Sequence, residues 1–161
     1  MKSKSIAIIG PGSCEQSLAE LAREVGFLLA QKGFTLICGG RGGVMEAACR
    51  GAKSADGTTI GILPGTSADE ANAFVDFPIV TGFGEARNII IVRSVRAVIA
   101  VGGEYGTLSE IAFALKLNVP VIALKTWKIT RNGEDAPDQR IIETDSPQAA
   151  VAAALAAIEN V

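Results

Sequence analysis

The run Val98-Ile99-Ala100-Val101-Gly102-Gly103-Glu104-Tyr105-Gly106-Thr107 decides the fold class of this chain. A short β-branched stretch, typical of a buried strand, leads directly into a glycine-rich loop. The loop leads into residues 107–117, which have the composition of a helix and end before Asn118 and Pro120. A strand, a tight glycine loop and a helix in this order form the repeating unit of an open α/β sheet.

The same unit recurs along most of the chain, and strands joined in this way form a parallel sheet. Helices are predicted over residues 15–32, 44–55, 85–96 and 107–117, with a last one starting at Ser146-Pro147. Strands are predicted over residues 5–9, 34–38, 58–63, 77–80, 97–101 and 120–124. Right-handed crossovers then give a Rossmann-like, doubly wound, mainly parallel α/β fold with helices on both faces. Asn132-Gly133 predicts a turn in an excursion whose strand pairing stays open.

Composition bounds the classes of function. The 161 residues predict one domain over 1–161, and a net charge of −2 offers no basic surface for nucleic acid or an anionic membrane. No stretch approaches the roughly 20 apolar residues that span a bilayer, so we expect a cytoplasmic protein. The chain has no histidine and only three cysteines, which excludes histidine-dependent nucleophiles and predicts no metal site.

Four glycine-rich loops are expected at one rim of the sheet. Ligands of open parallel sheets bind beyond the carboxyl ends of the strands, and residues 10–14, 39–43, 82–84 and 102–107 all follow predicted strands. Glycine permits close backbone approach, and a helix N-terminus offers free N–H groups to an anion. Each loop alone is equally explained as a tight turn, but four together favour a phosphorylated ligand. The candidate binding residues in the first two loops are Gly12, Ser13, Gly40, Arg41, Gly42 and Gly43.

Two side chains near this rim carry candidate chemistry. Arg87 lies at the start of a predicted helix, where a guanidinium can clamp phosphate; the alternative is a surface arginine paired with a carboxylate. Glu110 closes the run Thr107-Leu108-Ser109-Glu110, which is also a capping box. Loss of Glu110 would cost roughly 1 kcal/mol of stability if it is only a cap. It would remove activity and leave the fold nearly intact if it is catalytic.

These residues resemble a known family. The runs at 39–46, 60–65, Arg87-Asn88 and 102–110 are similar to the LONELY GUY and "lysine-decarboxylase-like" Rossmann superfamily. Within it, the chain resembles the short bacterial branch that includes molybdenum-cofactor carrier proteins. The resemblance implies a phosphoribohydrolase that cleaves the N-glycosidic bond of a nucleoside 5'-monophosphate. It places the catalytic pair on Arg87 and Glu110 and the phosphate loop on Gly103, Gly106 and Thr107. No metal or cofactor is required, and no lysine site for pyridoxal phosphate supports a decarboxylase.

Departures from the hydrolase pattern keep a second function open. Where the hydrolases have Pro-Gly-Gly-x-Gly-Thr-x-Glu-Glu, this chain has Gly102 to Glu110 with the leading proline, one glycine and one acid replaced. Glu104 adds a negative charge beside the expected phosphate unless it faces a cation such as Arg41. The alternative is a non-enzymatic carrier of a phosphorylated pterin, with molybdenum cofactor as cargo. The resemblance also implies a homodimer or higher homo-oligomer, in keeping with the apolar segment Ile89-Ile90-Ile91-Val92.

Overall fold

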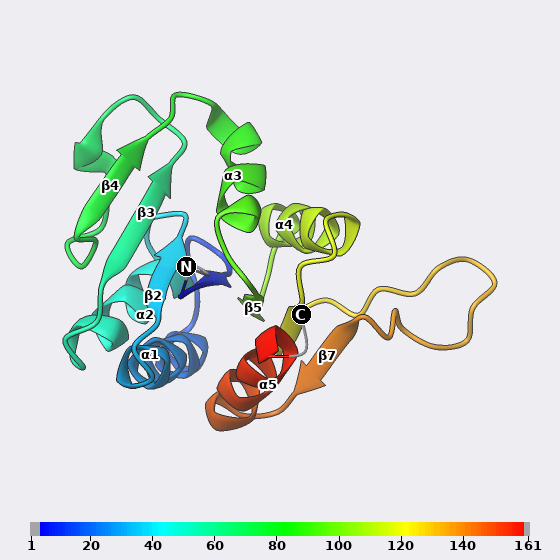
Figure 1. Ribbon diagram of the computed structural model, residues 1–161. Helices are drawn as coiled ribbons and strands as arrows, with labels where there is room; N and C mark the ends of the chain where they lie inside the picture. Colours follow the sequence, from blue (N-terminus) through cyan, green and yellow to red (C-terminus); the bar gives the residue numbers. More distant parts are fainter. Residues whose placement is uncertain (1–3, 160–161) are drawn as a thin grey trace.

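The computed structural model describes residues 4–159 and contains one seven-stranded, fully parallel sheet in the order β4-β3-β2-β1-β5-β6-β7. Figure 1 shows the helices arranged around this sheet. The strands are β1 (Ser5–Ile9), β2 (Thr35–Cys38), β3 (Thr59–Leu63), β4 (Phe77–Val80), β5 (Val98–Val101), β6 (Val121–Leu124) and β7 (Ile141–Thr144). The predicted Rossmann-like α/β class is therefore confirmed.

Helices cover both faces of the sheet. The α-helices are α1 (Gln16–Gln31), α2 (Val44–Lys53), α3 (Asn88–Arg93), α4 (Tyr105–Lys116) and α5 (Pro147–Glu159). Two 3₁₀ turns, η1 (Ala68–Glu70) and η2 (Gly84–Arg87), flank β4. The serine predicted to cap the last helix does so, because Ser146 Oγ accepts a hydrogen bond from the Ala149 N–H.

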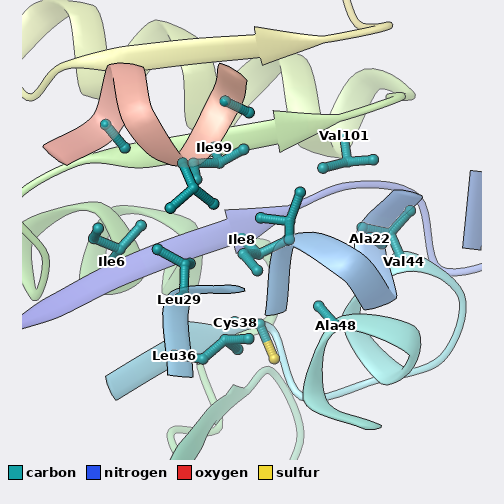
Figure 2. Packing of buried hydrophobic residues seen from close by; sticks show 14 of the residues in the cluster. Ile6, Ile8, Ala22, Leu29, Leu36, Cys38, Val44, Ala48, Ile99 and Val101 are labelled. Carbon is teal, nitrogen blue, oxygen red and sulfur yellow. The ribbon is translucent and has the colours of Figure 1, made fainter. Parts of the chain in front are cut away.

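The alternation of strand side chains divides the core into two clusters. Ile6 and Ile8 of β1 point to the face covered by α1, α2 and α5, whereas Ala7 and Ile9 point to the face covered by α3 and α4. Figure 2 shows the first cluster, with Ile8 and Ile99 from neighbouring strands buried among helix residues. Both faces of the central strands are buried, which explains their nearly continuous apolar sequence.

Glycines bring α1 and α2 unusually close. A Cβ on Gly26 would lie 2.1 Å from the Ala48 carbonyl oxygen, and one on Gly51 would lie 1.8 Å from the Arg23 carbonyl oxygen. Because those atoms belong to helix backbone, no side chain fits at either position. This close packing sets α2, and with it the loop that precedes it, against β1 and β2.

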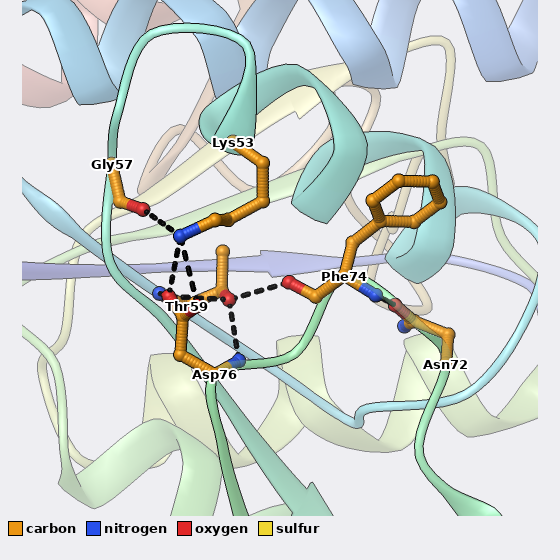
Figure 3. Close-up of polar contacts among 6 residues, drawn as sticks. All are labelled: Lys53, Gly57, Thr59, Asn72, Phe74 and Asp76. Atoms are coloured by element: carbon orange, nitrogen blue, oxygen red, sulfur yellow. Dashed lines mark hydrogen bonds and ion pairs between the residues drawn. The ribbon is translucent and has the colours of Figure 1, made fainter.

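A polar network fixes β3 against the segment that leads into β4 (Figure 3). Lys53 Nζ, at the end of α2, contacts Asp76 Oδ1 at 2.8 Å and donates to the Gly57 carbonyl. The Asp76 carboxylate also accepts from the Thr59 N–H, and the Thr59 hydroxyl donates to the Phe74 carbonyl. The network ties the end of α2 and the segment before β4 to one point at the start of β3.

Three predicted elements need correction. The helix predicted over 85–96 is the turn η2 followed by the short α3, which ends at Arg93. The helix predicted to start at Thr107 starts at Tyr105. A seventh strand, β7, pairs in parallel with β6, and the connection between them reaches away from the sheet (Figure 1). The predicted turn at Asn132-Gly133 is present in that connection, where the Glu134 N–H donates to the Arg131 carbonyl at 3.1 Å. It does not form a hairpin, because a parallel pair cannot be joined by a tight turn.

Candidate functional site

The candidate site lies where the direction of the sheet order reverses. The chain runs outward from β1 through β2 and β3 to β4, then returns to place β5 on the other side of β1. The loops after β1 and β5 therefore diverge and leave a crevice, the usual ligand position of doubly wound sheets. A cavity of about 140 Å³ opens there. Its lining residues are Ile9, Gly10, Pro11, Gly12, Gly39, Met45, Glu85, Arg87, Asn88, Glu104, Gly106, Thr107 and Glu110.

Arg87 is the only basic residue of this lining. It ends η2, directly before α3, and its side chain is only 8% exposed. Its Nε and Nη1 atoms are buried and have no hydrogen-bond partner among residues 4–159. Burial lowers the pKa of Arg87, while Glu110 and then Glu85 raise it, and the guanidinium stays charged. A buried cation with two unused donors is costly unless an acceptor is supplied.

The guanidinium occupies space that Gly39 leaves free. A Cβ on Gly39 would lie 2.1 Å from Arg87 Nη1 and 2.7 Å from Met45 Sδ. Gly39 follows directly on β2, so the end of that strand forms a wall against which the guanidinium packs. Sequence reasoning noted the glycine run at 39–43 but not this role for its first residue.

Glu110 lies in the second turn of α4 and is 7% exposed. Burial raises the pKa of its carboxyl to about 8, partly opposed by Arg87. No ion pair joins Arg87 to Glu110 in the part of the chain that the structure describes. At neutral pH Glu110 is therefore mostly protonated and does not neutralise Arg87.

The capping-box interpretation of Glu110 is wrong. The N-cap of α4 is Glu104, whose side chain makes no capping hydrogen bond, so Thr107 and Glu110 both lie inside the helix. Leu108 donates the first backbone bond of this turn, to the Glu104 carbonyl. The N–H groups of the preceding residues have no partner within the helix, and Gly106 and Thr107 among them line the cavity.

Two further contacts hold α3 and α4 in register around the cavity. Asn88 Nδ2 donates to Ser109 Oγ at 2.8 Å, and Ser109 Oγ donates to the Gly106 carbonyl at 2.7 Å. Asn88 is 4% exposed and adjacent to Arg87. These hydrogen bonds thus link the residue next to Arg87, Asn88, to the glycine loop through Ser109 and Gly106. Glu85 and Met45 also line the cavity, and no sequence signal singled them out.

The structure brings together only some of the predicted site residues. Arg87, Glu110, Gly12, Gly106 and Thr107 line the cavity. The remaining predicted residues lie outside its lining: Ser13, Gly40, Arg41, Gly42, Gly43 and Gly103.

The glycines outside the lining have a packing role instead. A Cβ on Gly40 would lie 2.7 Å from Leu63 Cδ2, and one on Gly43 would lie 2.3 Å from the Pro11 carbonyl oxygen. Both residues have positive φ, 74° and 62°. Gly40 therefore packs on β3 and Gly43 on the loop after β1, while Gly39 is the residue of this glycine run that lines the cavity. Arg41 is exposed and forms no ion pair with Glu104 among the described residues.

The cysteines do not take part in the cavity. Burial raises the pKa of the Cys14 thiol, which makes it a poorer nucleophile. Cys38 and Cys49 are buried with their Sγ atoms 3.5 Å apart. Residues 4–159 contain no group of acidic, cysteine and histidine side chains suited to a metal ion. Within the same range, every helix is too short or too polar to cross a membrane.

Several known proteins are similar to this chain in sequence or in structure. An uncharacterised protein of Archaeoglobus fulgidus is 51% identical over 125 residues, which cover 78% of this chain and 82% of that protein. The molybdenum cofactor binding protein of the phototrophic bacterium Rippkaea orientalis superposes with a TM-score of 0.88 at 37% identity, covering 98% of this chain and 99% of that one. The molybdenum cofactor carrier protein of Chlamydomonas reinhardtii gives 0.84 at 37% identity, with the same coverage.

These similarities extend over nearly the whole fold and confirm the superfamily that the sequence resembles. The profile of the SLOG cluster4 family matches residues 3–151. The chain belongs to the SLOG cluster4 family.

Proposed function

We propose that this protein binds the phosphate of a phosphorylated pterin at Arg87 and carries it without turnover, with molybdenum cofactor as cargo. The observation that carries the proposal is the buried guanidinium, whose Nε and Nη1 have no hydrogen-bond partner within the described residues 4–159. A phosphate supplies two or more acceptor oxygens and the compensating charge that this group lacks. The likeness to two molybdenum cofactor proteins at 37% identity supports the pterin.

The charges around the cavity suit binding better than cleavage. Glu110 with a pKa of about 8 is mostly neutral at pH 7, so it does not repel a phosphate. For the same reason it is poorly suited to stabilise a cationic, oxocarbenium-like ribose. Glu85 and Glu104 are exposed, where water screens their charges. Arg87 is thus the charged side chain of the lining that is buried from water.

Retention of cargo tests this proposal. The protein is produced in a host that makes molybdenum cofactor, and molybdenum and pterin are measured in the purified sample. We expect both to co-purify in equal amounts with the wild type and to be lost from Arg87→Ala. Arg93→Ala is the matched control, because Arg93 is an exposed arginine on the adjoining helix α3. Equal loss from both variants, or no molybdenum in any sample, would contradict the proposal.

A second candidate function rests on the pairing of Arg87 with Glu110 in one cavity. As a phosphoribohydrolase, the protein would add water at C1' of AMP, break the N-glycosidic bond and release adenine and ribose 5-phosphate. An ionised Glu110 would be needed to stabilise the cationic ribose, so the rate should rise as pH approaches about 8. Chromatography of free adenine tests this function, and release no greater than that of Glu110→Ala excludes it.

We also propose that the protein self-associates through β4. Phe77 and Ile79 are 58% and 46% exposed, although their partners in the register, Ile60 and Ile62, face the α3 and α4 side. Exposed apolar side chains on a parallel strand are unusual, since such sheets are normally covered on both faces. Pro78 stands where an N–H would face the open edge, which disfavours pairing through strand extension and favours face contact.

Sedimentation tests the oligomer. We expect Phe77→Ser with Ile79→Ser to shift the wild-type protein to monomer. Ile142→Ser, which alters an exposed residue at the opposite edge strand, should leave the oligomer intact. A monomeric wild type would contradict this part of the proposal.

A further inference from the structure

The one tyrosine and the one tryptophan of the chain form a pair beside the cavity. The ring centroids of Tyr105 and Trp127 are 5.7 Å apart and the rings are tilted by 38°. This separation is within the range of favourable aromatic contacts. Tyr105 is nevertheless 81% exposed, the largest exposure among the large apolar side chains of residues 4–159. Its ring is held by a neighbour but not covered.

The pair lies beside the cavity at the start of α4. Tyr105 is the first residue of α4 and lies between Glu104 and Gly106, which both line the cavity. Trp127 comes from the segment after β6, and its Nε1 donates to the Glu104 carbonyl at 3.2 Å. A Cβ on Gly103 would approach Trp127 Cδ1 to 3.1 Å, so the indole also packs on the glycine loop. Trp127 therefore fixes the loop and supports the tyrosine ring.

The cavity volume decides which part of a ligand it takes. About 140 Å³ is well below the roughly 300 Å³ at which pockets for whole small ligands begin. A cavity of this volume takes a phosphate and the atoms next to it, but not a whole phosphorylated nucleotide or pterin. If Arg87 holds the phosphate, the rest of the ligand extends to the rim of the cavity.

We propose that the exposed face of Tyr105 is the stacking surface for the planar ring of that ligand. The inference rests on the proposed phosphate site and adds the class of ligand, a phosphate ester that carries a flat heteroaromatic ring. Stacking is favourable because every such ring presents a π face to the tyrosine. The contact with Trp127 limits motion of the tyrosine ring before binding, so little further ordering is required.

The test compares ligands with and without a ring. Dissociation constants are measured by calorimetry for AMP, 6-hydroxymethylpterin phosphate and ribose 5-phosphate, with chromatography to check that the AMP stays intact. For the wild type, at least one ring-bearing ligand should bind more tightly than ribose 5-phosphate and quench the single tryptophan. Tyr105→Ala should weaken the ring-bearing ligand about tenfold and leave ribose 5-phosphate within about twofold. Tyr105→Phe, which keeps the ring, should restore binding.

Other results would contradict either the phosphate site or the stacking surface. If the wild type binds none of the three ligands, the phosphate site itself fails and the stacking surface with it. If it binds all three equally well, the phosphate site stands and the stacking surface is wrong. Equal weakening of ring-bearing and ring-free ligands by Tyr105→Ala would assign the residue to positioning of the loop. A changed sedimentation coefficient with unchanged ring preference would assign it to a protein contact.

Discussion

Gly39→Ala should weaken anion binding far more than it weakens the fold. Gly39 does not have the positive φ that would exclude alanine, so the backbone accepts the change. The new methyl would lie 2.1 Å from Arg87 Nη1, whereas ordinary contact begins at 3.4 Å. The guanidinium nitrogen must therefore move by about 1.3 Å, the difference between these distances.

The expected energies differ for folding and binding. The atoms that must yield are the ends of two flexible side chains, Arg87 and Met45, so we expect a loss of only about 1 kcal/mol in the free energy of unfolding. A displaced guanidinium loses aligned hydrogen bonds to phosphate, worth about 1.5–3 kcal/mol for a charged group. That range corresponds to roughly 10- to 150-fold weaker binding.

Two measurements check the prediction. Urea unfolding gives the stability, and calorimetric titration with ribose 5-phosphate gives the binding. Arg93→Ala is the control, because Arg93 is exposed on α3 and lies outside the cavity lining. If Gly39→Ala binds ribose 5-phosphate as tightly as Arg93→Ala and the wild type, Arg87 does not anchor the anion.

Three further predictions concern stability. Folding raises the pKa of Glu110 from 4.5 to about 8. The free energy of unfolding should therefore fall as the pH rises from 4.5 to about 8, by up to about 1.4 kcal/mol per pH unit. Urea titrations at several pH values should show this slope for the wild type and not for Glu110→Gln. Burial raises the pKa of Asp76, but bonds from Lys53 and Thr59 outweigh it and hold the pKa low. Its contribution should thus be present above pH 3.8 and lost on acidification; Asp76→Asn should cost about 1–3 kcal/mol in urea, and an unchanged midpoint would refute this. Gly51→Ala places a methyl against the backbone of α1. Thermal unfolding should show that the free energy of unfolding falls by about 3 kcal/mol or more. An unchanged melting temperature would show that α1 and α2 can move apart without cost.

Much of the fold follows from local sequence. Each β-branched run is short, each glycine loop follows such a run, and each helix has an apolar face. The alternation of strands and helices could therefore be predicted without knowledge of tertiary contacts. The strand β7 was not, because residues 141–144 pair with β6 across a connection that contains no helix. The helix that contains α3 was predicted too long, since the apolar pattern continues past Arg93 into the next strand.

The sequence alone identified the glycine loops, Arg87 and Glu110, because residue type and the order of motifs are properties of the chain. Only the tertiary structure decided which of them meet. The loops after β1 and β5 border the cavity since the sheet order reverses between those strands, whereas Gly40 and Gly43 pack against their neighbours. In the part of the chain that the structure describes, burial leaves Arg87 Nε and Nη1 without a hydrogen-bond partner and raises the pKa of Glu110. This burial arises from contacts between segments far apart in the chain, and no local pattern contains that information.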